Sequence, residues 1–279
     1  MLRFLAKRTG SVKTRLFLGL TQQRLALCSN QLNCAPIVEL LPETSTPALV
    51  QLIDQLINQH LNRSPSGSSL QVLLSTDISR VFLATPYPGI RNFTELQALV
   101  ALRFTQIYDE PSSNWTIQAD WSANRPFLVA ALPAEIINSL HKVCRLLKLK
   151  LATVLPYSLW QWNLCAKTLP ESGSLNIFEA CYVTQFIWQG PQVLSVRGAC
   201  TSGVDPLSLA HTVLSRETLR LNLPELPLYA AGLRFIPNST AAVEKRVQWL
   251  NQSSAHSDSC LVLDEFEPAL WLAQQGNTI

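Results

Sequence analysis

The amino-acid sequence predicts an α/β protein in which strands and helices alternate along the chain. Three observations favour this class: apolar runs of strand length, longer segments whose apolar residues recur at helical spacing, and turn-forming residues between them. Hydrophobic residues make up 47% of the 279 residues and charged residues only 15%, which excludes a disordered chain. At about 150 residues per domain, this length predicts two domains or one large one.

The first part of the chain opens with a predicted β-hairpin. The apolar runs 15–20 and 24–28 flank the short polar turn Thr21-Gln22-Gln23. Further strands are predicted at 37–41, 70–74, 81–84, 115–121, 126–132 and 151–155. Helices are predicted at 47–60, from the cap Thr94 to 107, and from Pro133 to 147.

A polar stretch with proline and glycine at 167–174 predicts a boundary between two domains, 1–166 and 167–279. The second part continues with β-like runs at 175–181, 184–188 and 192–196. Asp205 and Pro206 then begin a helix that runs to 221. The rest is predicted as a strand at 226–231, a helix at 240–250, a strand at 260–263 and a short helix at 268–274.

The charge balance and the motifs exclude several functions. Lys plus Arg is 22 and Asp plus Glu is 19, a net charge of +3 without a dense basic stripe, so we expect no nucleic-acid partner. No apolar stretch approaches the ~18 residues that span a bilayer. Neither G-x-x-x-x-G-K-[ST] nor G-x-G-x-x-G occurs, and the chain has only 10 glycines. An independent phosphate-binding loop is therefore not expected.

The residues also supply no catalytic constellation. His141 and Cys144, at i and i+3 of one predicted helix, are the best metal-like pair, but two ligands are too few for zinc. The acidic cluster at 264–267 precedes Pro268 and is interpreted as the start of a helix, where the helix dipole favours negative charge. We therefore expect no metal, no cofactor and no catalytic residue.

Four segments, in this order along the chain, resemble motifs of a known family. Leu18-Gly19-Leu20-Thr21 resembles a strand L-G-I-D before a first phosphate turn. The others resemble a second phosphate motif with its hairpin (175–198), an adenosine strand (228–232) and a closing helix (266–273). Together they resemble the PilM/GspL branch, with its MshI-like members, of the actin-like ATPase (ribonuclease H-like) superfold. These proteins are platform components of type IV pilus and type II secretion machines.

The resemblance implies a two-domain actin-like fold whose nucleotide site has degenerated. Thr21 stands where the family has an acidic residue, Gln22 and Gln23 replace a Gly/Ser-rich turn, Asn176 replaces an Asp and Phe178 a Gly. Gly232 ends a strand that normally ends in Gly-Gly. The first domain would carry an inserted subdomain at about 70–155. The second would be reduced, because the helix after Asp205 runs almost directly into the strand at 226 without the nucleotide-closing subdomain.

The function implied by the resemblance is a non-catalytic scaffold, a pseudo-ATPase, in the cytoplasm at the inner-membrane face of a Gram-negative bacterium. Its partner would be the cytoplasmic N-terminal tail of a PilN-like bitopic membrane protein, lying in a groove of the first domain. Other platform components, including the assembly ATPase, would be further partners, and membrane association would be peripheral, through them. One alternative is an active actin-like ATPase that gates assembly. A third, weaker alternative is a small-molecule enzyme on an unrelated α/β fold.

Overall fold

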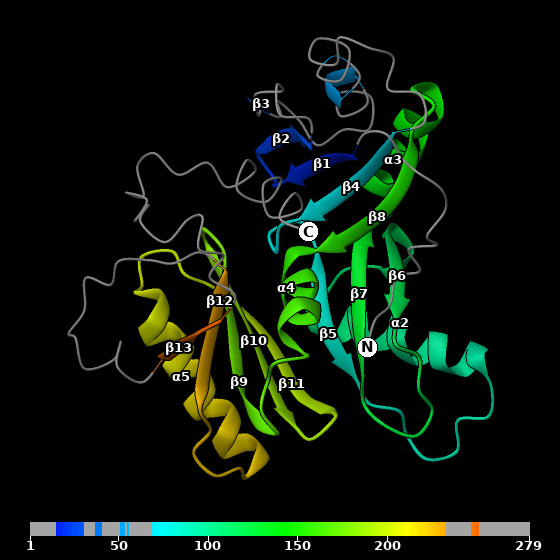
Figure 1. Cartoon of the computed structure of the whole chain (residues 1–279). Helices are drawn as coiled ribbons and strands as arrows, with labels where there is room; N and C mark the ends of the chain where they lie inside the picture. Colours follow the sequence, from blue (N-terminus) through cyan, green and yellow to red (C-terminus); the bar gives the residue numbers. More distant parts are fainter. Residues whose placement is uncertain are drawn as a thin grey trace.

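The first half of the molecule is organised around a five-stranded sheet with the order β3-β2-β1-β4-β8 (Figure 1). The computed structural model describes residues 15–30, 37–40, 51–53, 55, 68–232 and 247–250. Three antiparallel strands form the start of the sheet: β1 (Arg15–Leu20), β2 (Arg24–Ser29) and β3 (Ile37–Leu40). Two strands parallel to β1 complete it: β4 (Ser69–Leu74) and β8 (Lys150–Pro156).

The second half of the molecule, from residue 172 onward, repeats this strand arrangement. Its sheet has the order β11-β10-β9-β12-β13. The strands β9 (Ser172–Phe178), β10 (Tyr182–Gln189) and β11 (Gln192–Cys200) are antiparallel neighbours. The strands β12 (Leu228–Gly232) and β13 (Val247–Trp249) continue from β9 in parallel. Both sheets therefore place an antiparallel meander before two parallel strands, in the same spatial order.

A third, smaller sheet is inserted between β4 and β8. It has the order β5-β7-β6, from β5 (Arg80–Ala84), β6 (Trp115–Ala119) and β7 (Phe127–Pro133). Helix α2 (Phe93–Tyr108) covers it, and a 3₁₀ turn η1 (Ser112–Asn114) leads into β6 (Figure 1). Phe82 and Phe104 join sheet and helix in one buried cluster. The insert is narrower than the expected range of about 70–155, because β4 and β8 belong to the first sheet.

Helix α4 (Tyr157–Cys165) lies between β8 and the second sheet (Figure 1), and the sequence reasoning missed it. Most of its side chains are buried, including Tyr157, Leu159 and Cys165 at 0% exposure. A helix that is buried on every side carries no polar face, so the helical period that reveals an amphipathic helix is missing. Its residues join Leu155 of β8 and Phe186 of β10 in one core shared by both halves.

Two further helices cover the sheets, α3 (Ala134–Leu146) in the first half and α5 (Pro206–Leu221) in the second. The α5 cap is Asp205, as predicted; its carboxylate accepts the backbone N–H of Ser208. Residues 222–227 connect α5 to β12 directly. None of the helices in the described part of the chain combines the length and apolar character of a bilayer span.

Several predicted elements need correction. The N-cap of α2 is Asn92 and not Thr94, because the Asn92 side chain accepts the N–H of Glu95 at 2.9 Å. The helix predicted at 240–250 is wrong at its end, where Val-Gln-Trp forms β13 beside β12. Residues 51–53 and 55 of the helix predicted at 47–60 are helical. The elements predicted at 260–263 and 268–274, with the motif at 266–273, lie outside the described residues.

Candidate functional site

The two predicted phosphate hairpins both reach the turn that follows β4. On one side, the backbone N–H of Gln22, in the β1–β2 turn, donates to Asp77 Oδ2 at 2.9 Å. On the other side, Glu179, in the β9–β10 turn, accepts hydrogen bonds from Ser75 and Thr76. We call this group of residues, Gln22, Ser75, Thr76, Asp77 and Glu179, the hairpin junction.

Glu179 is the centre of the hairpin junction. Its Oε2 accepts the Ser75 hydroxyl at 2.8 Å and the Thr76 N–H at 2.9 Å, and its Oε1 accepts the Thr76 hydroxyl. The Thr76 and Thr184 hydroxyl oxygens lie 3.4 Å apart, which extends the network into β10. The carboxyl group thus connects the first half of the molecule to the second through three hydrogen bonds.

This carboxyl group is almost completely enclosed, with 3% of Glu179 exposed. Burial raises the pKa of Glu179 from its ordinary value of 4.5 to about 7; the three hydrogen bonds oppose that rise, and the charge of Asp77 adds to it. Asp77 Oδ1 is itself buried without a hydrogen-bond partner. The junction is therefore a tightly filled contact in which burial favours the neutral form of Glu179 and the three hydrogen bonds favour the charged form.

The predicted first phosphate turn is held by Thr21 through local hydrogen bonds. Its hydroxyl oxygen accepts the N–H of Arg24 at 3.0 Å and lies within 3.4 Å of the Gln23 N–H. The Thr21 N–H donates to the Arg24 carbonyl, which closes the hairpin. Gln22 and Gln23 are exposed. Thr21 thus shapes the turn and has little capacity left for an anion.

At the second predicted motif, Asn176 faces α5 and not the junction. Its Nδ2 donates to Ser174 Oγ and to the Tyr229 carbonyl, both at 3.2 Å, and its Oδ1 accepts Gln185 Nε2 at 2.7 Å. Gln185 Nε2 also donates to the Ala210 carbonyl of α5 at 3.1 Å. Asn176 is completely buried. Its amide therefore stabilises the packing of β9 and β10 against α5.

Phe178 and Gly232 meet at the ends of β9 and β12, where they are register partners. Phe178 is fully buried and packs with Val183, Leu207 and Ala210. Gly232 has a φ of +93°, and a Cβ there would lie 2.3 Å from the Phe178 carbonyl oxygen. Glycine is required at this position by the close approach of two strands, whether or not a nucleotide ever binds.

The structure thus brings together only part of the predicted set. Gln22 belongs to the hairpin junction, and Phe178 directly precedes Glu179 of the junction in the sequence. The side chain of Asn176 points away from the junction. Sequence reasoning missed Ser75, Thr76, Asp77 and Glu179. The one available signal is that Glu179 is an isolated acidic residue in the short turn between two apolar strands. Within the described ranges, no three His, Cys, Asp or Glu side chains form a group that could hold a metal ion.

Comparison with known proteins identifies the fold. No family model and no curated protein matches the sequence. Among solved structures, the cytoplasmic domain of EpsL, an inner membrane component of the type II secretion system of Vibrio cholerae, is 11% identical, with a TM-score of 0.52 over 96% of both chains. A PilM-PilN type IV pilus biogenesis complex contains a chain that is 15% identical, with a TM-score of 0.53 over 94% of this chain and 98% of that one.

A third solved structure, a Bacteroides thetaiotaomicron protein of unknown function, is described as having an actin-like ATPase fold. It is 8% identical, with a TM-score of 0.54 over 86% of this chain and 92% of that one. The repeated sheet order agrees with these similarities. The predicted fold is confirmed: the chain has the actin-like ATPase fold in a form similar to PilM and to the cytoplasmic domain of EpsL.

Proposed function

We propose that this protein is a non-catalytic scaffold in the inner-membrane assembly platform of a type IV pilus or type II secretion system. The observation that carries the proposal is its structural similarity, over nearly the whole chain, to a protein from a PilM-PilN complex. The similarity to the EpsL cytoplasmic domain supports the same class of machine. The scaffold is located in the cytoplasm at the face of the inner membrane, where it binds the N-terminal tail of a PilN-like membrane protein.

The geometry of the hairpin junction supports the absence of ATPase chemistry. Phosphate binding in such hairpins requires backbone N–H groups that are free to point at the anion. Here the Gln22 N–H donates to Asp77, and the junction is filled by the carboxyl group of Glu179. The charge of Asp77 at this place also repels a polyphosphate. The short connection at 222–227 leaves no room in the second half for a nucleotide-closing subdomain between α5 and β12.

The partner is tested by titrating the full chain with the synthetic cytoplasmic tail of the PilN-like protein from the same bacterium, using calorimetry. Binding in the micromolar range is expected, with a scrambled peptide of equal composition as the control. Extended peptides bind through backbone pairing and side-chain pockets, so composition alone cannot reproduce the affinity. Equal affinity for both peptides, or no binding at high micromolar concentration, would contradict the proposed partner.

The proposed absence of ATPase activity is tested separately, by thermal unfolding with and without MgATP. A ligand at 100 times its dissociation constant stabilises the folded state by about 2.7 kcal/mol, which raises the melting temperature measurably. We expect no change at millimolar MgATP. A clear rise, together with phosphate release above background, would support the alternative of an active actin-like ATPase.

A further inference from the structure

A groove with a volume of about 450 Å³ lies between the inserted sheet and the second half of the molecule. Its lining includes consecutive residues from two strands, 79–83 around β5 and 194–200 of β11. Among the described strands, β5 pairs only with β7, and β11 pairs only with β10, so each is the edge of its sheet. The groove therefore runs along two strand edges. We call it the β5–β11 groove.

Positive charge dominates the lining of this groove. Four arginines from four different elements contribute to it, and Asp77 is the one acidic residue among the lining residues of the described chain. The arginines are Arg80 of β5, Arg103 of α2, Arg197 of β11 and Arg220 of α5. Guanidinium groups recognise carboxylates with paired, charge-assisted hydrogen bonds, so the lining is complementary to an acidic ligand.

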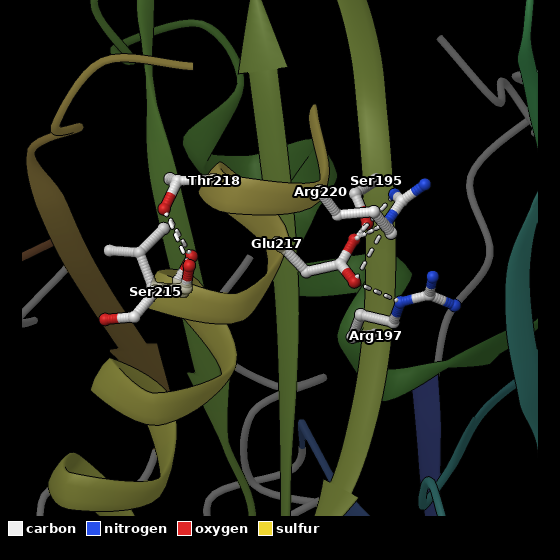
Figure 2. A network of polar contacts seen from close by, with 7 residues as sticks. Ser195, Arg197, Ser215, Glu217, Thr218 and Arg220 are labelled. Atoms are coloured by element: carbon white, nitrogen blue, oxygen red, sulfur yellow. Dashed lines mark hydrogen bonds and ion pairs between the residues drawn. The ribbon is translucent and has the colours of Figure 1, made fainter. Parts of the chain in front are cut away.

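Two of these arginines share a single carboxylate. Figure 2 shows Glu217 of α5 between Arg197 of β11 and Arg220 of its own helix, and Glu217 also accepts the Ser195 hydroxyl. Arg197 Nε lies 3.0 Å from Glu217 Oε1, and Arg220 Nη2 lies 2.7 Å from Oε2. The carboxylate of Glu217 thus holds both guanidinium groups in place, and the three side chains together carry a net charge of +1.

Both guanidinium groups remain accessible. The side chains of Arg197 and Arg220 are 42% and 49% exposed, whereas that of Glu217 is 9% exposed. Arg197 contacts Glu217 through Nε alone, and its Nη groups make no hydrogen bond within the described chain (Figure 2). Burial alone would raise the pKa of Glu217, but the hydrogen bonds from Arg220, Ser195 and Arg197 lower it to about 2, so the carboxylate stays charged. The two arginines are therefore held in position before a ligand binds, and they keep N–H groups that can donate to it.

Arg80 and Arg103 complete the lining in different ways. Arg80 is fixed between the rings of Tyr108 and Trp115, 5.4 and 5.1 Å from the ring centres, and pairs with Glu110 at 3.3 Å. Arg103 is exposed on α2, and no ion pair holds it within the described chain. Arg103 is therefore the charge that is most available to a ligand.

We propose that the β5–β11 groove docks an extended acidic segment of a partner protein. An extended chain fits because the lining follows both β5 and β11 over several consecutive residues. The arginines then select carboxylate side chains. This site lies between the insert and the second half, so it is separate from a groove within the first domain. It does not depend on the identity of the membrane partner proposed above.

The probe is a fluorescently labelled short peptide that alternates glutamate and valine, with a matched peptide that alternates glutamine and valine. Binding to the full-length protein is measured by fluorescence anisotropy at low and high salt. We expect the glutamate peptide to bind at micromolar concentration, more weakly in high salt, and the glutamine peptide to bind at least about ten-fold more weakly. No binding of the glutamate peptide at high micromolar concentration would overturn the proposal.

Charge reversal locates the site. Arg103→Glu should weaken binding of the glutamate peptide about ten-fold or more, because it removes an attractive charge and adds a repulsive one. Arg216→Glu is the matched control: Arg216 is exposed on α5 but does not line the groove. Equal weakening by both substitutions would show attraction to overall charge alone and would overturn the proposal.

A second variant fills the groove without changing its charge. Gly198 of β11 lines the groove, and a Cβ built there has no atom within 4 Å. Gly198→Val should therefore fold normally and obstruct the peptide, with an expected loss of binding of about ten-fold or more. Unchanged affinity in Gly198→Val, or displacement of the peptide by inorganic phosphate at similar concentrations, would show that no extended chain occupies the groove.

Discussion

Replacing Glu179 by glutamine tests how the two halves of the molecule are joined. A glutamine has the size of the glutamate and no charge. Its Oε1 can accept the Ser75 hydroxyl and the Thr76 N–H, as Glu179 Oε2 does, and its amide group can donate to the Thr76 hydroxyl. The variant therefore keeps the hydrogen bonds of the hairpin junction and removes only the ability of residue 179 to ionise.

The magnitude follows from the pKa of Glu179, which burial raises from 4.5 to about 7. The folded state then binds this proton more tightly than the unfolded chain does. The free energy of unfolding therefore falls as the pH rises from about 4.5 through 7, and the full penalty applies above pH 7. At about 1.4 kcal/mol per pH unit across this interval, the penalty is about 3 kcal/mol, an upper figure because water and local adjustment reduce it.

Urea unfolding followed by tryptophan fluorescence at several pH values between 4.5 and 8 measures the effect. Near pH 4.5 the wild type and Glu179→Gln should have similar stability, and at pH 8 the variant should be more stable by about 1 to 3 kcal/mol. Glu179→Ala is the control: it leaves the Ser75 and Thr76 donors without their acceptor and should be destabilised throughout. A difference between wild type and glutamine variant that does not change with pH would refute the reasoning.

Three further substitutions test the interior of the second half by the same unfolding measurement. Gly232→Ala should destabilise the protein by about 1 to 3 kcal/mol or more, because the φ of +93° and the Phe178 carbonyl oxygen both oppose a Cβ; a stability equal to that of the wild type would contradict this. Asn176→Asp should destabilise more at pH 8 than at pH 5, since an ionised oxygen would face the Tyr229 carbonyl; the opposite trend would show that Asn176 is not oriented as described. Glu217→Gln should cost about 1 to 3 kcal/mol throughout the range above pH 4.5, because a pKa of about 2 keeps the wild-type carboxylate ionised until the pH falls well below its ordinary value. A cost that vanishes between pH 7 and 5 would contradict the last prediction.

Local patterns were sufficient to predict most of the fold. The hairpin around Thr21 and the helix that begins after Asp205 appear where apolar spacing and the predicted cap placed them, and the insert helix appears with its cap at Asn92 instead of Thr94. The order of four weak motifs was enough to indicate the actin-like superfold, which the comparisons confirm. The proposed domain limits of 1–166 and 167–279 stay predictions; the change from α4 to β9 falls at 166–171.

The candidate sites could not be predicted in the same way, because they depend on contacts between distant segments. Glu179 is 104 residues from Ser75 along the chain, and no local pattern relates them. Asn176 shows the opposite problem: its motif position suggested a site residue, but its side chain is used within the core through Gln185. The β5–β11 groove likewise brings α2 and α5 to one place through tertiary packing alone.

The contacts between the two halves support the scaffold role proposed above. Closure around a ligand requires an interface that can open, with few contacts crossing it. Here the junction at Glu179, the buried helix α4 and the packing of Val81 and Leu83 against Val196 all join the halves. A groove whose two walls come from different halves is then formed before its ligand arrives. Such preorganisation lowers the cost of binding, which favours the capture of an extended segment that must itself become ordered.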